Sequence, residues 1–271
     1  MRYEAEVALR AARAASELIL HVYAEEFAVE YKAKDDPVTR ADREANALIV
    51  QHLARAFPGV PVVAEESPSD AYAGFAREDS CWFVDPLDGT REFVAKNGEF
   101  AVMIGLAEKG RPTVGVIVAP AWGRVFVGVV GEGAWEAAAD GSLRPISVSP
   151  CADVTKARFV VSRSRAPERV AGFVEGLGAA PARPHGSSGL KGVLVATGEA
   201  DVYLQPGRAG MRWDACATDA LVRAAGGELT DAHGDPIDYK SEDIENSRGM
   251  VGTNGKLHRA IVEALEQRRA R

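Results

Sequence analysis

The most informative segment of the sequence reads Trp82-Phe83-Val84-Asp85-Pro86-Leu87-Asp88-Gly89-Thr90. Its apolar residues predict a short strand, and two carboxylates stand where that strand ends. Pro86 fixes its own φ angle and favours an extended Asp85, so the chain can turn and direct Asp88 to the same place. The turn can also bring the carbonyl oxygen of Leu87 inward. Because two neighbouring carboxylates repel each other, we expect a cation between them.

The ligands of this predicted site favour a hard cation. Oxygen ligands of this kind suit magnesium or manganese better than zinc. A helix that begins at Gly89-Thr90 would place its free amides and the positive end of its dipole beside the carboxylates. The segment therefore predicts a place where a metal ion and a phosphate can meet.

Other acids stand at the ends of predicted elements. Val62-Val63-Ala64-Glu65-Glu66 predicts a buried strand that runs into adjacent glutamates, and Trp213-Asp214 stands at the head of a predicted helix. Each acid has a structural alternative: Glu66 could be a solvated surface residue, and Asp214 or Asp42 could belong to a helix cap. Taken together, they supply the ligands that two hard cations need.

The first half of the chain predicts two helices and then strands. Apolar residues at helical spacing predict a helix that contains Val7, Ala11, Ala14, Leu18 and Val22, and a second one that starts at Thr39 and ends before Pro58-Gly59. Short β-type runs follow at residues 60–64, 81–84, 101–107, 114–118 and 125–130. We interpret these runs as an antiparallel meander.

From about residue 141 strands alternate with helices. We expect strands at residues 158–161, 201–204 and 250–252, and helices at residues 167–177, 188–197, 213–225 and 254–269. The fold class is therefore α/β, with α+β layering. We expect an N-terminal α+β lobe (residues 1–140) with the antiparallel sheet and the main metal motifs, and a C-terminal α/β lobe (residues 141–271) that completes the metal site and the substrate pocket.

The composition restricts the possible partners. The chain has 39 acidic and 32 basic residues, and its formal net charge of -7 argues against a nucleic-acid polymer as partner. It has no apolar stretch of the roughly 20 residues that a membrane span needs. Its three cysteines are scattered, without a C-x-x-C pair. We expect a cytoplasmic protein without membrane partners, either a monomer or a homodimer.

Four motifs together resemble the lithium-sensitive inositol monophosphatase superfamily. They are Val38-Thr39-x-x-Asp42, Ala64-Glu65-Glu66-Ser67, Asp85-Pro86-Leu87-Asp88-Gly89-Thr90, and Trp213-Asp214-x-x-Ala217 through Gly227. The resemblance spans nearly the whole chain and implies a layered α/β/α/β/α sandwich. It also implies two or three Mg²⁺ ions per site, held by Glu65, Asp85, Asp88, Asp214 and the Leu87 carbonyl.

The same resemblance implies roles around the metals. Thr90, hydrogen-bonded to Asp42, would act with Glu65 to position and deprotonate the attacking water. The amides of Gly89 and Thr90 would hold the phosphate.

Three further motifs are similar to those of the 3′(2′),5′-bisphosphate nucleotidases, which remove the 3′-phosphate of adenosine 3′,5′-bisphosphate. They are Arg91-Glu92-Phe93-x-x-x-Asn97-Gly98-Glu99-Phe100, Ser162-Arg163-Ser164 and Gly186-Ser187-Ser188-x-x-Lys191. Inositol phosphatases usually carry a glutamate shortly before the Trp-Asp pair, where this chain has Gln205 followed by Arg208 and Arg212. We expect the substrate to contact Gly89, Thr90, Ser187, Ser188, Lys191, Arg212 and Asp214.

These observations lead to one main hypothesis and two alternatives. The main hypothesis is a magnesium-dependent phosphomonoesterase that uses metal-activated water to hydrolyse the 3′-phosphate of adenosine 3′,5′-bisphosphate or a related small phosphorylated metabolite. The first alternative is an inositol monophosphatase or sugar-phosphate phosphatase of the same fold. The second is a non-catalytic metal or nucleotide sensor, which the full set of acids disfavours.

Overall fold

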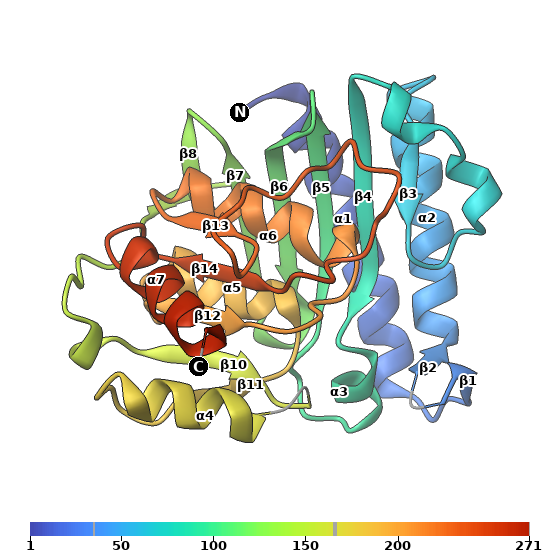
Figure 1. Cartoon of the computed structure of the whole chain (residues 1–271). Coiled ribbons are helices and arrows are strands. Elements are labelled where there is room, and N and C mark those ends of the chain that lie inside the picture. The colour runs from blue at the N-terminus through green and yellow to red at the C-terminus, as the bar shows by residue number, and fades with distance from the viewer. Residues whose placement is uncertain (35, 165–166, 271) are drawn as a thin grey trace.

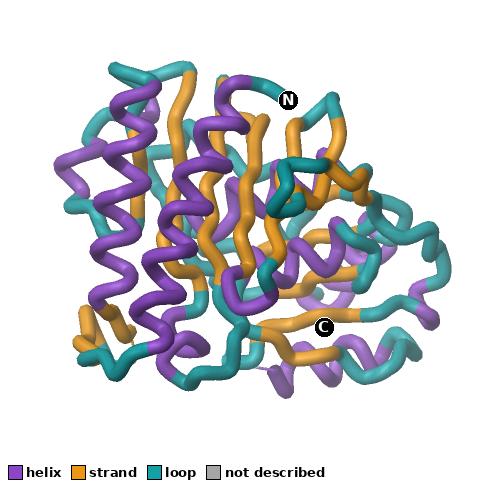
Figure 2. The backbone as a smooth tube through the Cα atoms, turned by 180° about the vertical axis from the view of Figure 1, so that it is seen from behind, coloured by secondary structure: helices purple, strands orange, loops and turns teal. Residues whose placement is uncertain are grey.

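Two long helices form one outer layer of the molecule (Figures 1 and 2). The computed structural model describes residues 1–34, 36–164 and 167–270. The helices are α1 (Tyr3–Ala24) and α2 (Arg40–Ala56), and their small and branched apolar residues pack in one core with the sheet beneath them. The start of α2 is fixed by a capping box, in which the Thr39 amide donates to Asp42 Oδ2 (2.7 Å) and the Ala41 amide to Thr39 Oγ1 (3.2 Å). The predicted cap is confirmed.

A seven-stranded sheet forms the second layer, with strands in chain order across it. Its strands are β3 (Val62–Ala64), β4 (Ser80–Asp88), β5 (Ala101–Glu108), β6 (Arg111–Ala119), β7 (Arg124–Val129), β8 (Gly133–Ala137) and β9 (Leu143–Ile146). The meander is antiparallel from β4 to β9, as predicted for β4 to β7, whereas β8 and β9 were not predicted. The prediction was wrong for β3, which pairs with β4 in parallel.

The parallel pairing of β3 has a local cause and a consequence for the site. Between the two strands the chain forms two short 3₁₀ helices, Ser69–Tyr72 and Phe75–Arg77, that carry it back to the start of the neighbouring strand. The register pairs Ala64 with Val84. Residue 65 therefore leaves the sheet at the same end as residue 85, and two of the predicted site acids become neighbours.

The second sheet has five strands in the order β11-β10-β12-β14-β13. They are β10 (Phe159–Ser162), β11 (Arg183–His185), β12 (Val202–Gln205), β13 (Glu228–Thr230) and β14 (Met250–Thr253). β10 is parallel to β11 and β12, whereas β14 is antiparallel to β12 and β13. The sequence patterns did not indicate the three-residue strands β11 and β13.

Helices lie between the two sheets and outside the second one (Figure 1). The inner pair is α5 (Ser188–Ala196) and α6 (Arg212–Ala224), and the outer pair is α4 (Pro167–Gly176) and α7 (His258–Arg269). This order of layers is the expected α/β/α/β/α sandwich. In the described part of the chain no helix is both long and apolar enough to cross a membrane.

Helix α6 comes unusually close to the first sheet because three glycines face it. Gly105, Gly115 and Gly128 are paired side by side on β5, β6 and β7. An added Cβ would lie 2.6 Å from the Ala217 amide nitrogen, 2.3 Å from the Ala217 carbonyl oxygen and 2.7 Å from Leu221 Cα, respectively. No side chain fits there, so α6 rests directly on the sheet backbone. We call these three glycines the glycine seat.

Two small elements shape the mouth of the site. The hairpin of β1 (Val29–Ala33) and β2 (Asp36–Thr39) was not predicted, and it carries Lys32. The short helix α3 (Thr90–Val94) begins where the sequence indicated, after Gly89. Gly89 has a φ of 97°, and a Cβ there would lie 2.8 Å from the Glu99 carbonyl oxygen, so the turn requires glycine.

Candidate active site

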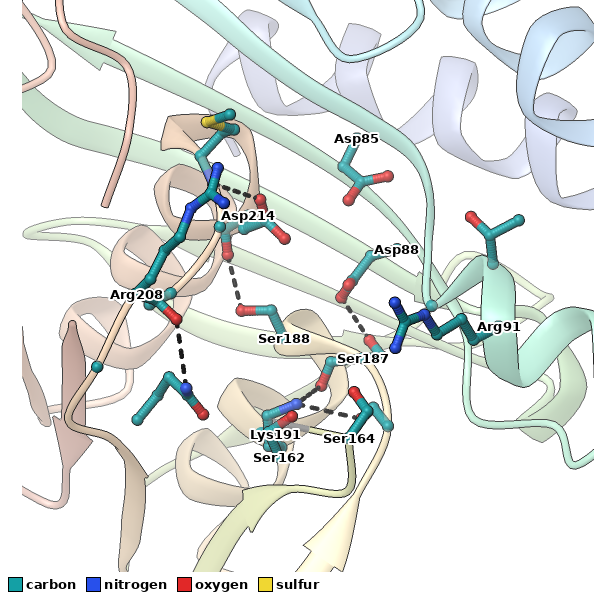
Figure 3. A pocket seen from close by; sticks show the side chains of 18 of the residues that line it. Asp85, Asp88, Arg91, Ser162, Ser164, Ser187, Ser188, Lys191, Arg208 and Asp214 are labelled. Atoms are coloured by element: carbon teal, nitrogen blue, oxygen red, sulfur yellow. Dashed lines mark hydrogen bonds between the residues drawn. The ribbon is translucent and has the colours of Figure 1, made fainter. Parts of the chain in front are cut away.

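Three carboxylates meet in one cavity of about 1330 Å³. Asp85 and Asp88 come from the end of β4, and Asp214 comes from the first turn of α6. Each offers one carboxylate oxygen, and these oxygens lie within 4.8 Å of one another (Figure 3). The two halves of the sequence therefore contribute to one acid cluster.

The turn that Pro86 introduces brings the first two acids together. The register between β4 and β5 shifts between Asp85 and Asp88, and the Leu87 amide donates to Asp85 Oδ1 (3.0 Å). Leu87 lines the cavity, and its carbonyl oxygen lies 3.2 Å from Thr90 Oγ1. This arrangement agrees with the turn that the sequence predicted.

The cluster is electrostatically suited to a cation. Burial and repulsion from Glu65, Asp88 and Asp214 raise the pKa of Asp85 well above its ordinary value. Burial also raises the pKa of Glu65 to about 7, against the attraction of Lys32. Buried carboxylate oxygens that repel one another form the kind of donor set that fits hard divalent cations.

We expect Mg²⁺ to raise the melting temperature more at about pH 8 than at about pH 5, because the cation must displace protons from these acids. A carboxyl group whose folded-state pKa is raised favours folding at acid pH, and it loses this contribution as pH rises through the folded pKa. For Glu65 that loss extends to about pH 7.

Melting curves with Mg²⁺ and with chelator, at each pH, test this prediction. The difference between the melting temperatures with Mg²⁺ and with chelator removes the contribution of histidines that do not contact the metal, because they titrate equally in both measurements. A Mg²⁺-induced shift that does not depend on pH would contradict the assignment of these acids as ligands.

Glu65 lies beside the acid cluster but is held by a lysine. Lys32 Nζ is 2.8 Å from Glu65 Oε1 and 2.6 Å from Glu66 Oε1. Although burial opposes it, attraction to Glu65 raises the pKa of Lys32, which stays charged. Glu66 is therefore not the freely solvated acid of the structural alternative. Lys32 was missed because a single lysine in a polar segment gives no sequence signal.

Asp42 and Thr90 form the predicted pair. Thr90 Oγ1 lies 2.9 Å from Asp42 Oδ1. The other oxygen of Asp42 accepts from the amide and the hydroxyl of Thr39, each at 2.7 Å. Both interpretations of Asp42 therefore hold at once, since one oxygen caps a helix and the other orients a hydroxyl beside the acid cluster.

Of the two predicted substrate serines, one bonds a carboxylate of the acid cluster and the other bonds the backbone beside it. Ser187 Oγ donates to Asp88 Oδ2 (2.6 Å), and Ser188 Oγ donates to the Asp214 carbonyl oxygen (2.9 Å). Lys191 is only 4% exposed, and its ammonium donates to the carbonyl oxygens of residues 185, 186 and 187. All three residues line the cavity, but these bonds hold the cavity wall together (Figure 3).

The structure places Arg212 elsewhere than predicted. Its guanidinium donates to the carbonyl oxygens of Asp238 (3.1 Å) and Glu245 (3.0 Å) and to the side chain of Asn246, which ties α6 to the connection between β13 and β14. Arg212 is not among the described residues that line the cavity. Arg208, which pairs with Glu245, does line it.

Several cations surround the acids. The described cavity wall contains Lys32, Lys34, Arg91, Lys191, Arg208, Arg268 and Arg269. In the view of Figure 3, Arg91 and Arg208 lie on opposite sides of the acid cluster. Gln205, the residue in the place of the usual glutamate, also lines the cavity, and its amide nitrogen donates to the Arg208 carbonyl oxygen (3.3 Å). A metal ion and an anionic substrate can therefore share this cavity.

The layered sandwich thus carries an acid cluster at the end of β4 with cations around it, an arrangement suited to a metal ion and a phosphate. The chain belongs to the inositol monophosphatase family, whose model matches residues 1–270.

Curated relatives include the 3′(2′),5′-bisphosphate nucleotidase CysQ of Salmonella typhimurium, which is 37% identical over 230 residues, or 84% of this chain and 90% of the relative. Among solved structures, CysQ from Bacteroides thetaiotaomicron is 32% identical with a TM-score of 0.74, covering 93% of this chain and 97% of that one. The inositol monophosphatase from Anabaena is 27% identical with a TM-score of 0.78, covering 97% and 94%.

Proposed function

We propose that this protein is a magnesium-dependent phosphatase that removes the 3′-phosphate of adenosine 3′,5′-bisphosphate. The observation that carries the proposal is the distribution of charge in the cavity, where a compact acid cluster lies among arginines and lysines from several elements. Such a cavity can hold one phosphate at the metals and a second one on the cations. The 37% identical relative is a 3′(2′),5′-bisphosphate nucleotidase, which supports a nucleotide with two phosphates as the substrate class.

Under this proposal, each residue of the site has a distinct role. Asp85, Asp88 and Asp214 would hold two or three magnesium ions, together with Glu65 and the Leu87 carbonyl. When bound, magnesium would lower the pKa of a water and offset the charge of the phosphate. The Thr90 hydroxyl donates to Asp42, so its lone pairs are directed to accept from the attacking water. Glu65 would take up the proton of that water, as the resemblance to the family implies.

A substrate comparison tests the proposal. With Mg²⁺ present, kcat/KM should be higher for adenosine 3′,5′-bisphosphate than for inositol 1-phosphate or fructose 1,6-bisphosphate. The highest value on inositol 1-phosphate would favour an inositol monophosphatase instead. Failure to turn over any of the three would favour a sensor.

We also propose that the protein is located in the cytoplasm and is a monomer or a homodimer.

We also expect chelation to abolish the activity and Mg²⁺ to restore it, because all proposed ligands are hard oxygens and the described site offers no activated covalent nucleophile. The measurement is phosphate release before and after exhaustive chelation. Full activity in the chelated protein would contradict a metal-dependent mechanism.

Specificity for a second phosphate should depend on Arg208. In Arg208→Met a charge-assisted contact worth about 1.5–3 kcal/mol is lost. That corresponds to roughly a tenfold to hundredfold fall in kcat/KM for the bisphosphate. Inositol 1-phosphate has no second phosphate and should be affected much less.

Arg212→Met is the matched control, since Arg212 is not among the described residues that line the cavity. We expect it to lower the melting temperature without changing the ratio of the two kcat/KM values. An equal loss on both substrates in Arg208→Met would mean that Arg208 acts only through the general field of the site.

A further inference from the structure

Glu99 joins the three nucleotidase-like motifs in space. It lies between α3 and β5, and its carboxylate accepts from Arg163 Nη2 at 2.6 and 2.8 Å and from Arg163 Nε at 3.2 Å. Glu99 Oε2 also accepts from the Gly186 amide (2.7 Å). Although burial opposes it, these hydrogen bonds lower the pKa of Glu99, which stays ionised. Glu99 and Arg163 are not among the described residues that line the cavity.

The segment that Glu99 holds is residues 185–189, which run from the end of β11 into the first turn of α5 and which we call the α5 loop. Its amide side is bound by Glu99, and its carbonyl side is bound by the Lys191 ammonium. Ser187 within it has a φ of 54°, a conformation that a non-glycine residue adopts only when its surroundings impose it. Gly186 has no room for a side chain, because a Cβ would lie 2.4 Å from Glu92 Cγ.

The α5 loop in turn fixes one carboxylate of the acid cluster. Ser187 Oγ and the Gly189 amide both donate to Asp88 Oδ2, at 2.6 and 2.7 Å. Two bonds to the same oxygen fix the rotation of the Asp88 carboxylate. A ligand that is oriented in this way binds a metal more tightly than one that must be ordered when the metal arrives.

We propose that Glu99 is a positioning residue for the metal site, acting through the α5 loop on Asp88 without contacting metal or substrate. The inference rests on the metal site of the proposed function. The segments around Glu99, Arg163 and Gly186 each supply one part of a single hydrogen-bonded clamp.

Mn²⁺ binding, measured by the EPR signal of free Mn²⁺ during titration of the chelated full-length protein, tests this role. Glu99→Ala is expected to weaken Mn²⁺ binding by roughly tenfold, the low end of the range for direct partners of a metal ligand, because Glu99 acts on Asp88 only through the α5 loop. It should also lower kcat at saturating Mg²⁺ with little change in KM. Glu99→Gln should weaken Mn²⁺ binding less than Glu99→Ala. Its single amide oxygen can still accept a hydrogen bond, whereas two carboxylate oxygens of Glu99 now accept from Arg163 and the Gly186 amide.

Glu136→Ala is the matched control. Glu136 pairs with Arg124 in a similar way (2.7 Å), and its side chain is 17% exposed against 19% for Glu99. It is not among the described residues that line the cavity. We expect Glu136→Ala to leave Mn²⁺ affinity unchanged.

Two results would overturn the proposal. One is a folded Glu99→Ala that binds Mn²⁺ as tightly as wild type, and the other is an equal weakening in Glu136→Ala. If Glu99→Ala does not fold, Glu99→Gln decides, and unchanged affinity there overturns the proposal. If wild type turns over no phosphate ester, the proposed function fails, but the Mn²⁺ affinities still decide the role of Glu99.

Discussion

Asp85→Asn should lower kcat by more than about 100-fold, beyond the range usual for partners of metal ligands, and yet leave the metal-free protein at least as stable as wild type. The raised pKa of Asp85 means that the fold disfavours its charge, and the neutral amide removes repulsion from the neighbouring acids. Asparagine also keeps the oxygen that accepts from the Leu87 amide. Kinetics at saturating Mg²⁺ and melting curves in chelator measure the two effects.

A substitution of Asp85 distinguishes a metal-ligand role from a structural role better than a substitution of Asp88 or Asp214 does. Asp88 Oδ2 accepts two hydrogen bonds from the α5 loop, and Asp214 Oδ2 accepts one from the Met211 amide (2.7 Å). Asparagine at either position can weaken the fold by removing charge-assisted bonds, in addition to its effect on the metal.

The same substitution at Asp201 provides the control. Asp201 is also buried, but hydrogen bonds from Arg158 and Ser149 outweigh burial and lower its pKa. We expect Asp201→Asn to lower the melting temperature and to leave the Mg²⁺ response intact. If metal-free Asp85→Asn loses as much stability as Asp201→Asn, Asp85 is a structural residue.

Thr90→Ala should reduce kcat by roughly 10²- to 10⁴-fold, the range that general acid–base groups contribute, while Mg²⁺ affinity is kept. The hydroxyl that donates to Asp42 is lost, and none of the proposed metal-binding side chains is changed. Thr90→Ser keeps the hydroxyl and should retain most of the activity. Single-turnover rates and Mn²⁺ titration measure the two quantities separately. A Thr90→Ala enzyme with near-normal kcat, or one that no longer binds metal, would contradict the assigned role.

Local sequence features predicted much of this site. The capping box depends on residues three apart, and the turn at Pro86 depends on one short segment, so both could be predicted from neighbouring residues. Whether Asp42 served the helix or the site could not be decided from spacing, because its second oxygen contacts Thr90, 48 residues further along the chain.

Features set by tertiary contacts could not be predicted. The sequence did not show which of Arg208 and Arg212 lines the cavity. The answer depends on the connection at residues 238–246, which holds the Arg212 guanidinium. The parallel pairing of β3 depends on two 3₁₀ helices without hydrophobic periodicity. Lys32 reaches Glu65 only because an unpredicted hairpin folds over the cavity mouth.

The glycine seat has a consequence for the order of events during synthesis. All strands of the first sheet have left the ribosome once residue 146 has emerged, but the face with Gly105, Gly115 and Gly128 is fully covered only when α5 and then α6 have followed. Asp214 arrives on that same helix. A nascent chain that lacks α6 thus presents an apolar sheet face of the kind that chaperones bind, together with an incomplete acid cluster. Full burial of this sheet face and completion of the acid cluster therefore both depend on α6.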